Sequence, residues 1–448
     1  MPLISGLPAA GSFDVTGTGH LPSAFAVSDL ANASVAAAGL ELARLIAALN
    51  LAPAAPTVTV NQRLASLWFG CSFRPSGWEM PALWDPVAGN YQAADGWIRL
   101  HTNLPAHRDA ALRALGCAGT RAAVAAAVRS WDAEALETAV VREGGAAAAM
   151  RSRAEWLAHP QGKAVAAEPL IHWAEQRKIT LRDRPEATAA RPLAGLKLLD
   201  LTRVLAGPIA SRTLAGFGAE VLRIDPPDWD EPGVIPDVSL GKRMAYLDLK
   251  TAAGRARFEA LLAEADVLVH GYRPDALEHL GLGLARRDEV APDRVEVTLD
   301  AYGWTGPWAG RRGFDSLVQM SAGIADAGMG WAGADKPLPL PVQALDHATG
   351  YLLAAAALAA LAAAARGEAV PHARLSLART AELLAALVPA AQGAAITGPA
   401  DADYTVLPED SGWGPGQRLK PPVQLEGTAM RWDLPAHRCG TSHPAWSA

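Results

Sequence analysis

One acidic residue stands where a carboxylate could act as a nucleophile. Asp346, in the run QALDHATG, precedes an Ala- and Leu-rich helical pattern over Ala348–Ala365. A carboxylate is already ionised at pH 7, so it can attack an acyl carbon and form an energetic acyl intermediate without a general base. Asp is also common at the start of helices, where its side chain caps free backbone amides. Both roles are open from the local sequence, and they can coexist.

The stretch 196–224, LKLLDLTRVLAGPIASRTLAGFGAEVLRI, is the element expected to organise such a site. An apolar run over Leu196–Leu201 ends in the turn TRVLAGP, a helical pattern follows, and Val221–Ile224 is a second apolar run. This order predicts a strand, a turn, a helix and a parallel strand, the unit of a doubly wound sheet. The Gly-Pro pair of the turn suits a helix start that binds an anion, because free amides and the helix dipole meet there. The alternative is that the pair only starts a helix.

Composition limits the partners. The chain has 448 residues, of which 50% are hydrophobic and 19% charged, enough for two or three domains. Its formal net charge of −6 indicates neither nucleic acid nor an anionic membrane surface as the main partner, although a local basic patch could hold a small anion. The three cysteines are few and scattered, which argues against disulfides and zinc and favours a reducing compartment. We therefore expect no metal and a cytoplasmic location.

Neither a secretory signal nor a membrane span is expected. The N-terminal run MPLISGLPAAGSFD has no basic region and no long apolar region. The longest apolar run, Gly350–Ala365, is shorter than the ~20 residues that a membrane helix needs. We interpret it as a buried helix.

The spacing of the remaining patterns predicts an α/β fold, with a Rossmann-like open parallel sheet domain and a second, smaller α+β domain. We divide the chain into four parts: 1–69, a partial first copy with its own Asp-helix segment; 70–190, the small domain; 191–392, the Rossmann-like domain; and 393–448, an irregular tail expected to pack on the large domain. Further strands of the large domain are expected at Ala245–Leu249, Val267–Val269 and Val295–Leu299, with a helix over Ala252–Glu264.

The chain also contains an internal echo. Asp29 precedes an Ala-rich helical pattern over Leu30–Leu49, followed by a β-type run at Thr57–Val60 and another helix. The same order recurs after Asp346, with a β-type run at His372–Leu377. Ala-rich helices match easily by chance, so the echo becomes informative only together with a second observation.

Four motifs supply that observation, in order along about 192–390: PLAGLKLLDLTRVLAGPIASRTLAGFGAEVLRIDPP, GKRMAYLDLKTAAGR, ADVLVHGYRPDALEHLGLG and YGWTGPWAGRRGFDSLVQMSAG. Together they resemble the family III CoA-transferases (CaiB/BaiF), which include formyl-CoA transferase, carnitine CoA-transferase and α-methylacyl-CoA racemase. Residues 84–160 resemble the family's small domain, which in the family follows the catalytic half. We interpret the chain as a rearranged or partly duplicated member, in which Asp29 is a vestige and a helix cap.

The resemblance implies a reaction and a set of site residues. It places Asp346 on the position of the family's nucleophile, which passes through an aspartyl mixed anhydride and an aspartyl-CoA thioester. It implies an acyl-CoA substrate that carries coenzyme A, a carboxylic acid acceptor and an interlocked homodimer. The positions that match the family's coenzyme A contacts are Val204, Leu205, Ala206, Leu247, Lys250, Gly271, Tyr272, Ala276 and Arg312. Gly271 departs from the family's usual Asn, and His270 is the candidate to replace that side chain.

The substrate pocket is expected at Phe314 and Asp315, and it bears on the alternatives. The racemases resemble this segment but carry His at the position of Phe314 as one of two acid/base groups, and Phe cannot exchange a proton. His347 or Asp315 could take that part, so an acyl-CoA racemase or isomerase stays open. So does a catalytically decayed CoA-binding protein, because the run FRPSGWEM at 73–80 lacks the family's Gly-rich shielding loop and GMGWAG at 328–333 lies elsewhere in the order.

A fourth reading is an NAD-dependent enzyme, in which Asp225 would contact a ribose. The turn TRVLAGP lacks the Gly pattern of that class, which disfavours this reading.

Overall fold

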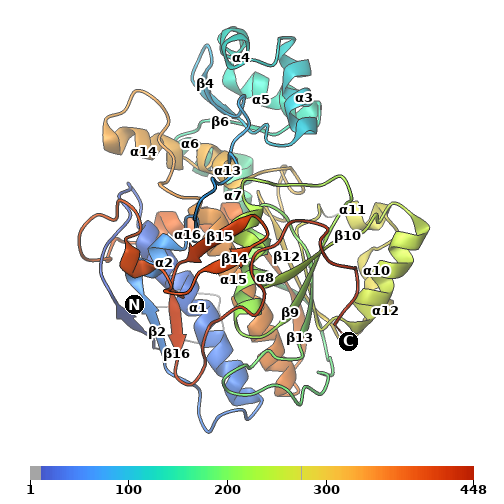
Figure 1. Cartoon of the computed structure of the whole chain (residues 1–448). Helices are drawn as coiled ribbons and strands as arrows, with labels where there is room; N and C mark the ends of the chain where they lie inside the picture. Colours follow the sequence, from blue (N-terminus) through green and yellow to red (C-terminus); the bar gives the residue numbers. More distant parts are fainter. Residues whose placement is uncertain (1–11, 274, 448) are drawn as a thin grey trace.

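The computed structural model describes residues 12–273 and 275–447 of the chain. They form a large body built on a central sheet and a smaller body that stands on it at the top of Figure 1. Along the chain, the smaller body follows the first helices of the large body and precedes the strands of the central sheet.

The central sheet has seven strands in the order β10-β9-β8-β11-β12-β13-β7. Every neighbouring pair is parallel except β13 and β7, which is the antiparallel edge. The strands are β7 (His172–Arg177), β8 (Lys197–Leu201), β9 (Glu220–Asp225), β10 (Lys242–Tyr246), β11 (Val267–His270), β12 (Val295–Asp300) and β13 (Val370–Ser376). The predicted α/β class and open parallel sheet are confirmed.

The third predicted strand is shifted. The apolar pattern placed it at Ala245–Leu249, whereas β10 begins at Lys242, which is fully buried. The Lys242 ammonium donates to the Asp200 carboxylate (3.1 Å) and to the Pro208 carbonyl oxygen (2.8 Å). A strand that starts with a buried, paired charge has no apolar signal at its beginning.

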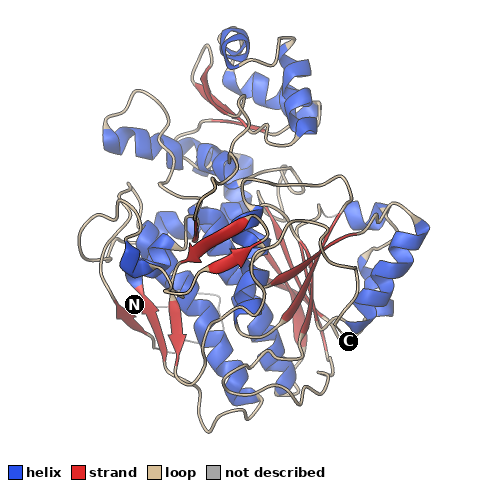
Figure 2. Ribbon diagram, in the orientation of Figure 1, coloured by secondary structure: helices blue, strands red, loops and turns tan. Residues whose placement is uncertain are grey.

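Helices cover both faces of this sheet, as Figure 2 shows. On one face lie α8 (Ala206–Gly216), α15 (Ala344–Ala365) and α1 (Val27–Ala48); on the other lie α10 (Ala252–Glu264), α11 (Ala276–His279) and α12 (Leu284–Val290). Neighbouring strand residues alternate between the two cores: Leu198 packs toward α8 and α15, and Leu199 packs toward Phe258 of α10. This alternation explains why the strands read as continuous apolar runs. The short helices α9 (Ile235–Val238), α13 (Asp315–Ser321), α14 (Ile324–Ala332) and α16 (Leu377–Ala386) complete this body.

The smaller body has a core of its own around Ile98, Val124 and Leu136. It consists of an antiparallel sheet, β4 (Gly89–Gln92), β5 (Trp97–Leu100) and β6 (Ala147–Ala149), and of α3 (Pro105–Leu115), α4 (Arg121–Val128) and α5 (Ala133–Arg142). Helices α6 (Arg153–Ala158) and α7 (Pro160–Ala167) lead back to the sheet. The smaller body spans fewer residues than the predicted range 70–190. The strands β3 (Phe73–Pro75) and β7 at the two ends of that range pair with β15 and β13 of the large body.

The C-terminal segment packs on the large body and joins it to the start of the chain. Its strand β16 (Val423–Leu425) pairs with β2 (Val58–Asn61), which also pairs with β1 (Asp14–Thr16). The remaining elements are α2 (Gln62–Leu67), the turn η1 (Asp401–Asp403), β14 (Glu409–Ser411) and β15 (Gly414–Arg418). Further along, the Ser442 amide donates to the Met244 carbonyl oxygen on β10 (2.8 Å).

Helices α1 and α15 repeat each other in backbone detail and pack side by side (Figure 1). Each has 22 residues with Asp in the third position, and their N-cap residues have nearly the same dihedral angles (φ −76°, ψ 59° and φ −76°, ψ 64°). After each helix, at the same distance from its Asp, one residue adopts a positive φ: Asn50 (55°) and Gly367 (72°). The two helices therefore share their local geometry, and a partial internal duplication stays a prediction.

Both helices begin earlier than expected, so the interpretation of their Asp residues as caps is wrong. Asp29 and Asp346 lie inside the first turn, and the N-cap residue of α15, Gln343, makes no side-chain capping bond. The Asp29 carboxylate accepts a hydrogen bond from the distant Ala390 amide (3.1 Å). By length and composition, both helices could cross a membrane; in this structure both are almost entirely buried in the protein.

Candidate active site

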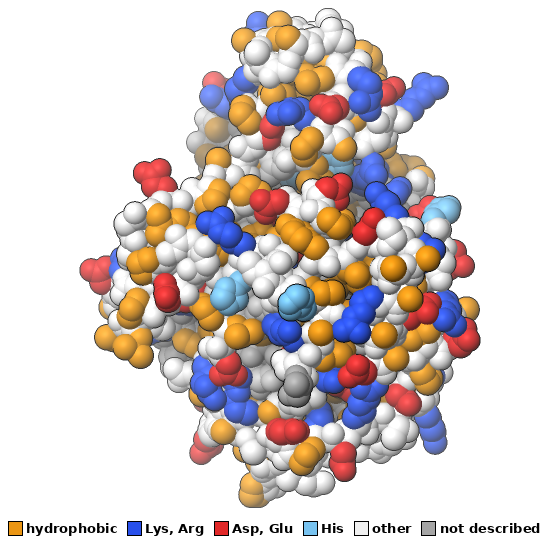
Figure 3. All heavy atoms as spheres, turned by 45° about the vertical axis from the view of Figure 1, so that its right-hand side comes forward, with side chains coloured by type: hydrophobic (Ala, Val, Ile, Leu, Met, Phe, Trp, Pro, Cys, Tyr) orange, Lys and Arg blue, Asp and Glu red, His pale blue; other side chains and the backbone are white. Residues whose placement is uncertain are grey.

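A cavity of about 720 Å³ lies between the smaller body and the carboxyl ends of the central strands. This is where open α/β sheets bind ligands. Basic side chains gather at the junction of the two bodies (Figure 3). The lining that concerns the predicted site comprises Arg203, Val204, Ala206, Gly271, Tyr272, Arg273, Ala276, Arg312, Phe314 and Asp346 from the large body, and Trp84, His101 and His107 from the smaller one.

Asp346 lines this cavity although only 5% of its surface is exposed. Its carboxylate accepts a hydrogen bond from the Ala206 amide, the first residue of α8. It therefore lies where the N-termini of α8 and α15 meet, and the free amides and helix dipoles there favour a negative charge. Close approach of the two helices requires Gly350, because a side-chain carbon there would lie 2.5 Å from the Ala206 carbonyl oxygen.

Asp315, fully buried behind the cavity wall, holds the start of α15. One of its carboxylate oxygens accepts from the amides of Leu345 (2.9 Å) and Asp346 (3.0 Å), and the other accepts from the Gln319 side chain. It supplies the cap that α15 lacks locally. Burial raises the pKa of Asp315 to about 6.

The pKa of Asp346 is raised well above its ordinary value. Burial is the main cause, the neighbouring Asp315 charge adds to it, the Ala206 amide opposes it, and Glu231 contributes a smaller rise. A carboxylate in this position is a stronger base and nucleophile than a solvated one once it is ionised, but it is ionised only at higher pH.

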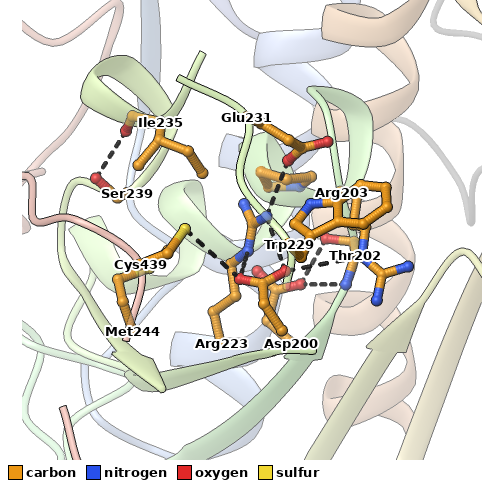
Figure 4. A network of polar contacts seen from close by, with 12 residues as sticks. Asp200, Thr202, Arg203, Arg223, Trp229, Glu231, Ile235, Ser239, Met244 and Cys439 are labelled. Atoms are coloured by element: carbon orange, nitrogen blue, oxygen red, sulfur yellow. Dashed lines mark hydrogen bonds and ion pairs between the residues drawn. The ribbon is translucent and has the colours of Figure 1, made fainter. Parts of the chain in front are cut away.

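The turn between β8 and α8 is held by hydrogen bonds to two carboxylates, those of Asp200 and Glu231 (Figure 4). The Asp200 carboxylate accepts from the Thr202 amide (2.8 Å) and its hydroxyl. Val204 has a positive φ of 63°, a strained conformation for a β-branched residue, and its amide donates to the Glu231 carboxylate (2.9 and 3.1 Å). Gly207 is needed for contact with Thr202 rather than with a ligand, since a side-chain carbon there would lie 2.2–2.4 Å from the Thr202 side chain.

Arg203 at this turn projects between two aromatic rings. Its guanidinium lies 4.2 Å from the Trp229 ring centroid and 5.3 Å from that of Tyr272, and it donates to the Tyr272 hydroxyl (3.1 Å). Figure 4 shows Arg203 beside Trp229, above the ion pairs of Arg223. Both rings line the cavity, and the contact of Tyr272 with coenzyme A stays a prediction.

Two more arginines, Arg273 and Arg312, line the same cavity. Burial and the neighbouring Arg273 charge lower the pKa of Arg312. Two like charges facing one cavity repel each other, and an anion bound between them would relieve that repulsion. The cavity therefore combines a buried carboxylate with a cationic region.

Some predicted residues lie away from the cavity. Leu205 is buried in the core, Leu247 packs on the opposite core, and Lys250 is exposed on the surface with its backbone amide bound to Asp248 (2.9 Å). None of the three is part of the lining, so their roles stay predictions.

The side chains proposed for alternative chemistries are engaged elsewhere. His270, the candidate replacement for the family's Asn, faces Glu296 (3.3 Å) inside the protein. His347 packs on the Phe69 ring (5.4 Å between centroids), and burial lowers its pKa to about 3. Asp225 is bound by Arg223 through two hydrogen bonds (2.9 and 3.1 Å), so it is not free for a ribose. The run 328–333 lies largely in α14 and outside the large cavity.

Sequence reasoning missed the contribution of the smaller body. Trp84, His101 and His107 lie in a separate domain by pattern, and no motif links them to Asp346. It placed Arg203 in the turn that matches the family's first coenzyme A contact but assigned its side chain no role, and it missed Arg273 as a cavity residue, although Arg273 stands inside a quoted motif. Within residues 12–273 and 275–447, the structure brings together no group of three or more His, Cys, Asp or Glu side chains that could hold a metal ion.

Comparison with known proteins gives the same family as the motifs. Residues 193–405 match the model of CoA-transferase family III. The chain is 35% identical over 186 residues to the acetyl-coenzyme A transferase nodX of Hypoxylon pulicicidum, which covers 40% of this chain and 31% of that protein. It is 34% identical over 191 residues to a probable fatty acyl-CoA transferase of Mycobacterium tuberculosis (40% and 48%) and 30% identical over 288 residues to an acyl-CoA transferase of Gibberella moniliformis (59% and 50%).

The chain thus spans between a third and a half of the length of the curated relatives it matches. The matched segment carries the turn before α8, the cavity arginines and Asp346. Over this segment, residues 193–405, the chain is similar to CoA-transferase family III.

Proposed function

We propose that this protein moves coenzyme A from an acyl-CoA thioester to a carboxylic acid, with Asp346 as the covalent nucleophile. The observation that carries the proposal is the place of this carboxylate, in the wall of a large cavity and bound by the first amide of α8. Similarity to the family and the CoA-transferase names of the relatives support the same class of reaction.

In the proposed reaction, a carboxylate oxygen of Asp346 attacks the thioester carbon, and the C–S bond breaks with its electron pair on the thiolate. The thiolate then attacks the Asp346 carbonyl carbon of the mixed anhydride and releases the donor acid, leaving an aspartyl-CoA thioester. The acceptor carboxylate attacks this thioester to give a new anhydride and free thiolate. Finally the thiolate attacks the acceptor's acyl carbon, and the Asp346 carboxylate is restored.

The chain's own groups support these steps. The Ala206 amide, already bound to the Asp346 carboxylate, is placed to stabilise the negative charge that builds on an Asp346 oxygen when the thiolate or the acceptor attacks the Asp346 carbonyl carbon. Three cavity arginines, Arg203, Arg273 and Arg312, suit the phosphates of coenzyme A, because one guanidinium group can donate two parallel hydrogen bonds to a phosphate. The mutual repulsion of Arg273 and Arg312 in the unliganded cavity is the observation that fits an anionic ligand.

We further propose that one chain supplies the whole site. The cavity takes its lining from both bodies of the same chain, and helix α1 covers the face of α15 that would otherwise be open to a partner. Self-association as a homodimer stays a prediction, and the site as described does not depend on it.

The direct test is to trap the covalent intermediate. The protein is incubated with a panel of acyl-CoAs and then with hydroxylamine, and peptide mass spectrometry locates the hydroxamate. The expected result is a hydroxamate at Asp346 with at least one donor. Asp346→Asn should lose the adduct and more than about a thousandfold in turnover, the scale seen when a nucleophile is removed.

Asp29→Asn is the matched control, because Asp29 has the same place in the repeated helix but does not line the cavity. It should keep both adduct and turnover. Bound acyl-CoA without any adduct would contradict the proposal. Exchange of the α-proton of that ligand with solvent deuterium would then favour a racemase or isomerase.

A further inference from the structure

Two buried histidines of the smaller body, His101 and His107, line the same cavity as Asp346 and have no part in the proposed steps. His101 follows β5, and His107 lies in the first turn of α3. Only 4% and 6% of their surfaces are exposed. Neither Nδ1 atom has a hydrogen-bond partner among the described residues, which is costly for a buried polar atom.

The two imidazoles hold Phe314 between them. The rings of His101 and Phe314 are stacked, 3.6 Å between centroids and 4° from parallel, and His107 meets Phe314 edge-on at 5.8 Å. Phe314 directly precedes Asp315, the residue that binds the amide of Asp346. This cluster is therefore close to the proposed nucleophile, and its side chains contact whatever part of a substrate binds beside Asp346.

Both imidazoles are uncharged at neutral pH. Burial, aided by the nearby Arg312 charge, lowers the pKa of His107 to about 4. Burial and the neighbouring Arg99 and His107 hold the pKa of His101 well below its ordinary value. A neutral imidazole has one N–H donor and one acceptor, so it suits an uncharged oxygen better than a carboxylate or phosphate. With Nδ1 sealed in the protein, the tautomer with hydrogen on Nε2 avoids burying an unpaired donor.

We propose that His101 and His107, with Phe314 between them, select acyl groups that carry an uncharged oxygen, a hydroxyl or a carbonyl, near the reacting carbon. The Phe314 ring and Trp84, whose ring meets His101 edge-on at 5.7 Å, supply flat apolar surface for the carbon chain. The inference rests on the proposed function, since it assigns the acyl end of that substrate. The amides of the pantetheine arm of coenzyme A carry the same kind of oxygen and are the competing source.

The test compares two donors that differ by one oxygen, β-hydroxybutyryl-CoA and butyryl-CoA. The measured quantity is the ratio of their kcat/KM values in the wild type, His101→Phe and His107→Phe. Phe keeps the ring contacts with Phe314 and removes both nitrogens. The wild type should favour the hydroxylated donor, and each variant should lower the ratio about threefold to tenfold, the range for one net hydrogen bond. His107→Gln, which keeps an amide donor, should recover part of the preference.

His159→Phe is the matched control, because His159 also stacks on an aromatic ring, that of Trp156, but lies outside the cavity lining. Its ratio should equal that of the wild type. Equal losses for both donors in the His101 and His107 variants would place the contact on the pantetheine arm and overturn the proposal, as would unchanged ratios.

The ratio can also be measured without turnover, as the ratio of the two dissociation constants by calorimetry. A hydroxyl preference in binding that the variants reduce would uphold the inference even if Asp346 forms no adduct. An adduct at Asp346 with no hydroxyl preference in binding or turnover would uphold the proposed function and overturn the inference. The two failures are therefore distinguishable.

Discussion

Replacing Asp315 by Asn should loosen the start of α15 and change how Asp346 ionises. An Asn oxygen can still accept from the amides of Leu345 and Asp346, but its NH₂ group would face the NH₂ group of Gln319. Gln319 cannot turn its oxygen around at no cost, because that oxygen accepts the Leu340 amide (2.7 Å). Unsatisfied buried donors cost about 1–3 kcal/mol each, and removal of a buried charge offsets part of this. We expect Asp315→Asn to lower the free energy of unfolding by about 1–3 kcal/mol.

A second substitution should restore the lost contacts. In Asp315→Asn/Gln319→Glu, the new carboxylate accepts from the Asn NH₂ group and from the Leu340 amide. Gln319→Glu alone would instead place two carboxylates against each other. Urea unfolding of the four proteins gives the double-mutant cycle, in which the pair should be more stable than either single variant. A double variant that is less stable than both singles would refute this account of the cap.

The single variant Asp315→Asn also tests how the Asp315 charge affects the ionisation of Asp346, the proposed nucleophile. The Asp315 charge helps to raise the pKa of Asp346, and in the proposed reaction only ionised Asp346 attacks. The rate should rise with pH as Asp346 loses its proton. Removing the Asp315 charge lowers the pKa of Asp346, so the acidic limb of the kcat/KM profile should move to lower pH in Asp315→Asn. A limb that stays in place or moves to higher pH would refute the coupling.

Three further predictions follow from the site. Folding raises the pKa of Asp346, so the ionised side chain destabilises the folded protein. Stability is therefore highest below the unfolded-state pKa and is lost as pH rises through the folded-state pKa. Asp346→Asn should raise Tm at about pH 8 and change it little at about pH 4. Arg312→Gln should raise KM for acyl-CoA about tenfold to a hundredfold, from one charged hydrogen bond, and leave KM for a phosphate-free pantetheine thioester unchanged, with the exposed Arg431→Gln as control. If one chain supplies the whole site, activity per chain should stay constant through a dilution series in which light scattering shows any dimer dissociating.

The strands around the site could be predicted because of how parallel sheets are buried. With helices on both faces, β8, β9, β11 and β12 are buried on both sides, and the Val, Leu and Ile residues that cluster in them are a visible signal in the sequence. The start of β10 gave no such signal, since Lys242 is buried only because Asp200, 42 positions earlier, neutralises it. A pair so distant in sequence cannot be recognised until the strands are aligned.

The position of Asp346 relative to its helix could not be predicted for a related reason. Local preference places Asp at a helix N-cap, which led to an expected start at Ala348. The structure begins the helix at Ala344 because Asp315, 31 positions earlier, accepts the first amides. The local pattern had no information about this distant cap, so the Asp side chain was assigned the capping role that another residue performs. It is thereby free to line the cavity.

The two similar helices, α1 and α15, show what distinguishes Asp346, the proposed nucleophile, from Asp29. Asp29 and Asp346 share helix position, N-cap geometry and burial, so backbone alone does not distinguish them. Their partners do: Asp29 accepts the amide of the exposed Ala390, away from the cavity, whereas Asp346 accepts the amide that begins α8 and faces a cavity that is also lined by arginines. Within the described residues, the strained turn at Val204 and the cap at Asp315 lie beside α15 and have no counterpart beside α1. The proposed chemistry therefore depends on the place where α8, α13 and α15 meet, and an Asp at the same position of a similar helix is not sufficient for it.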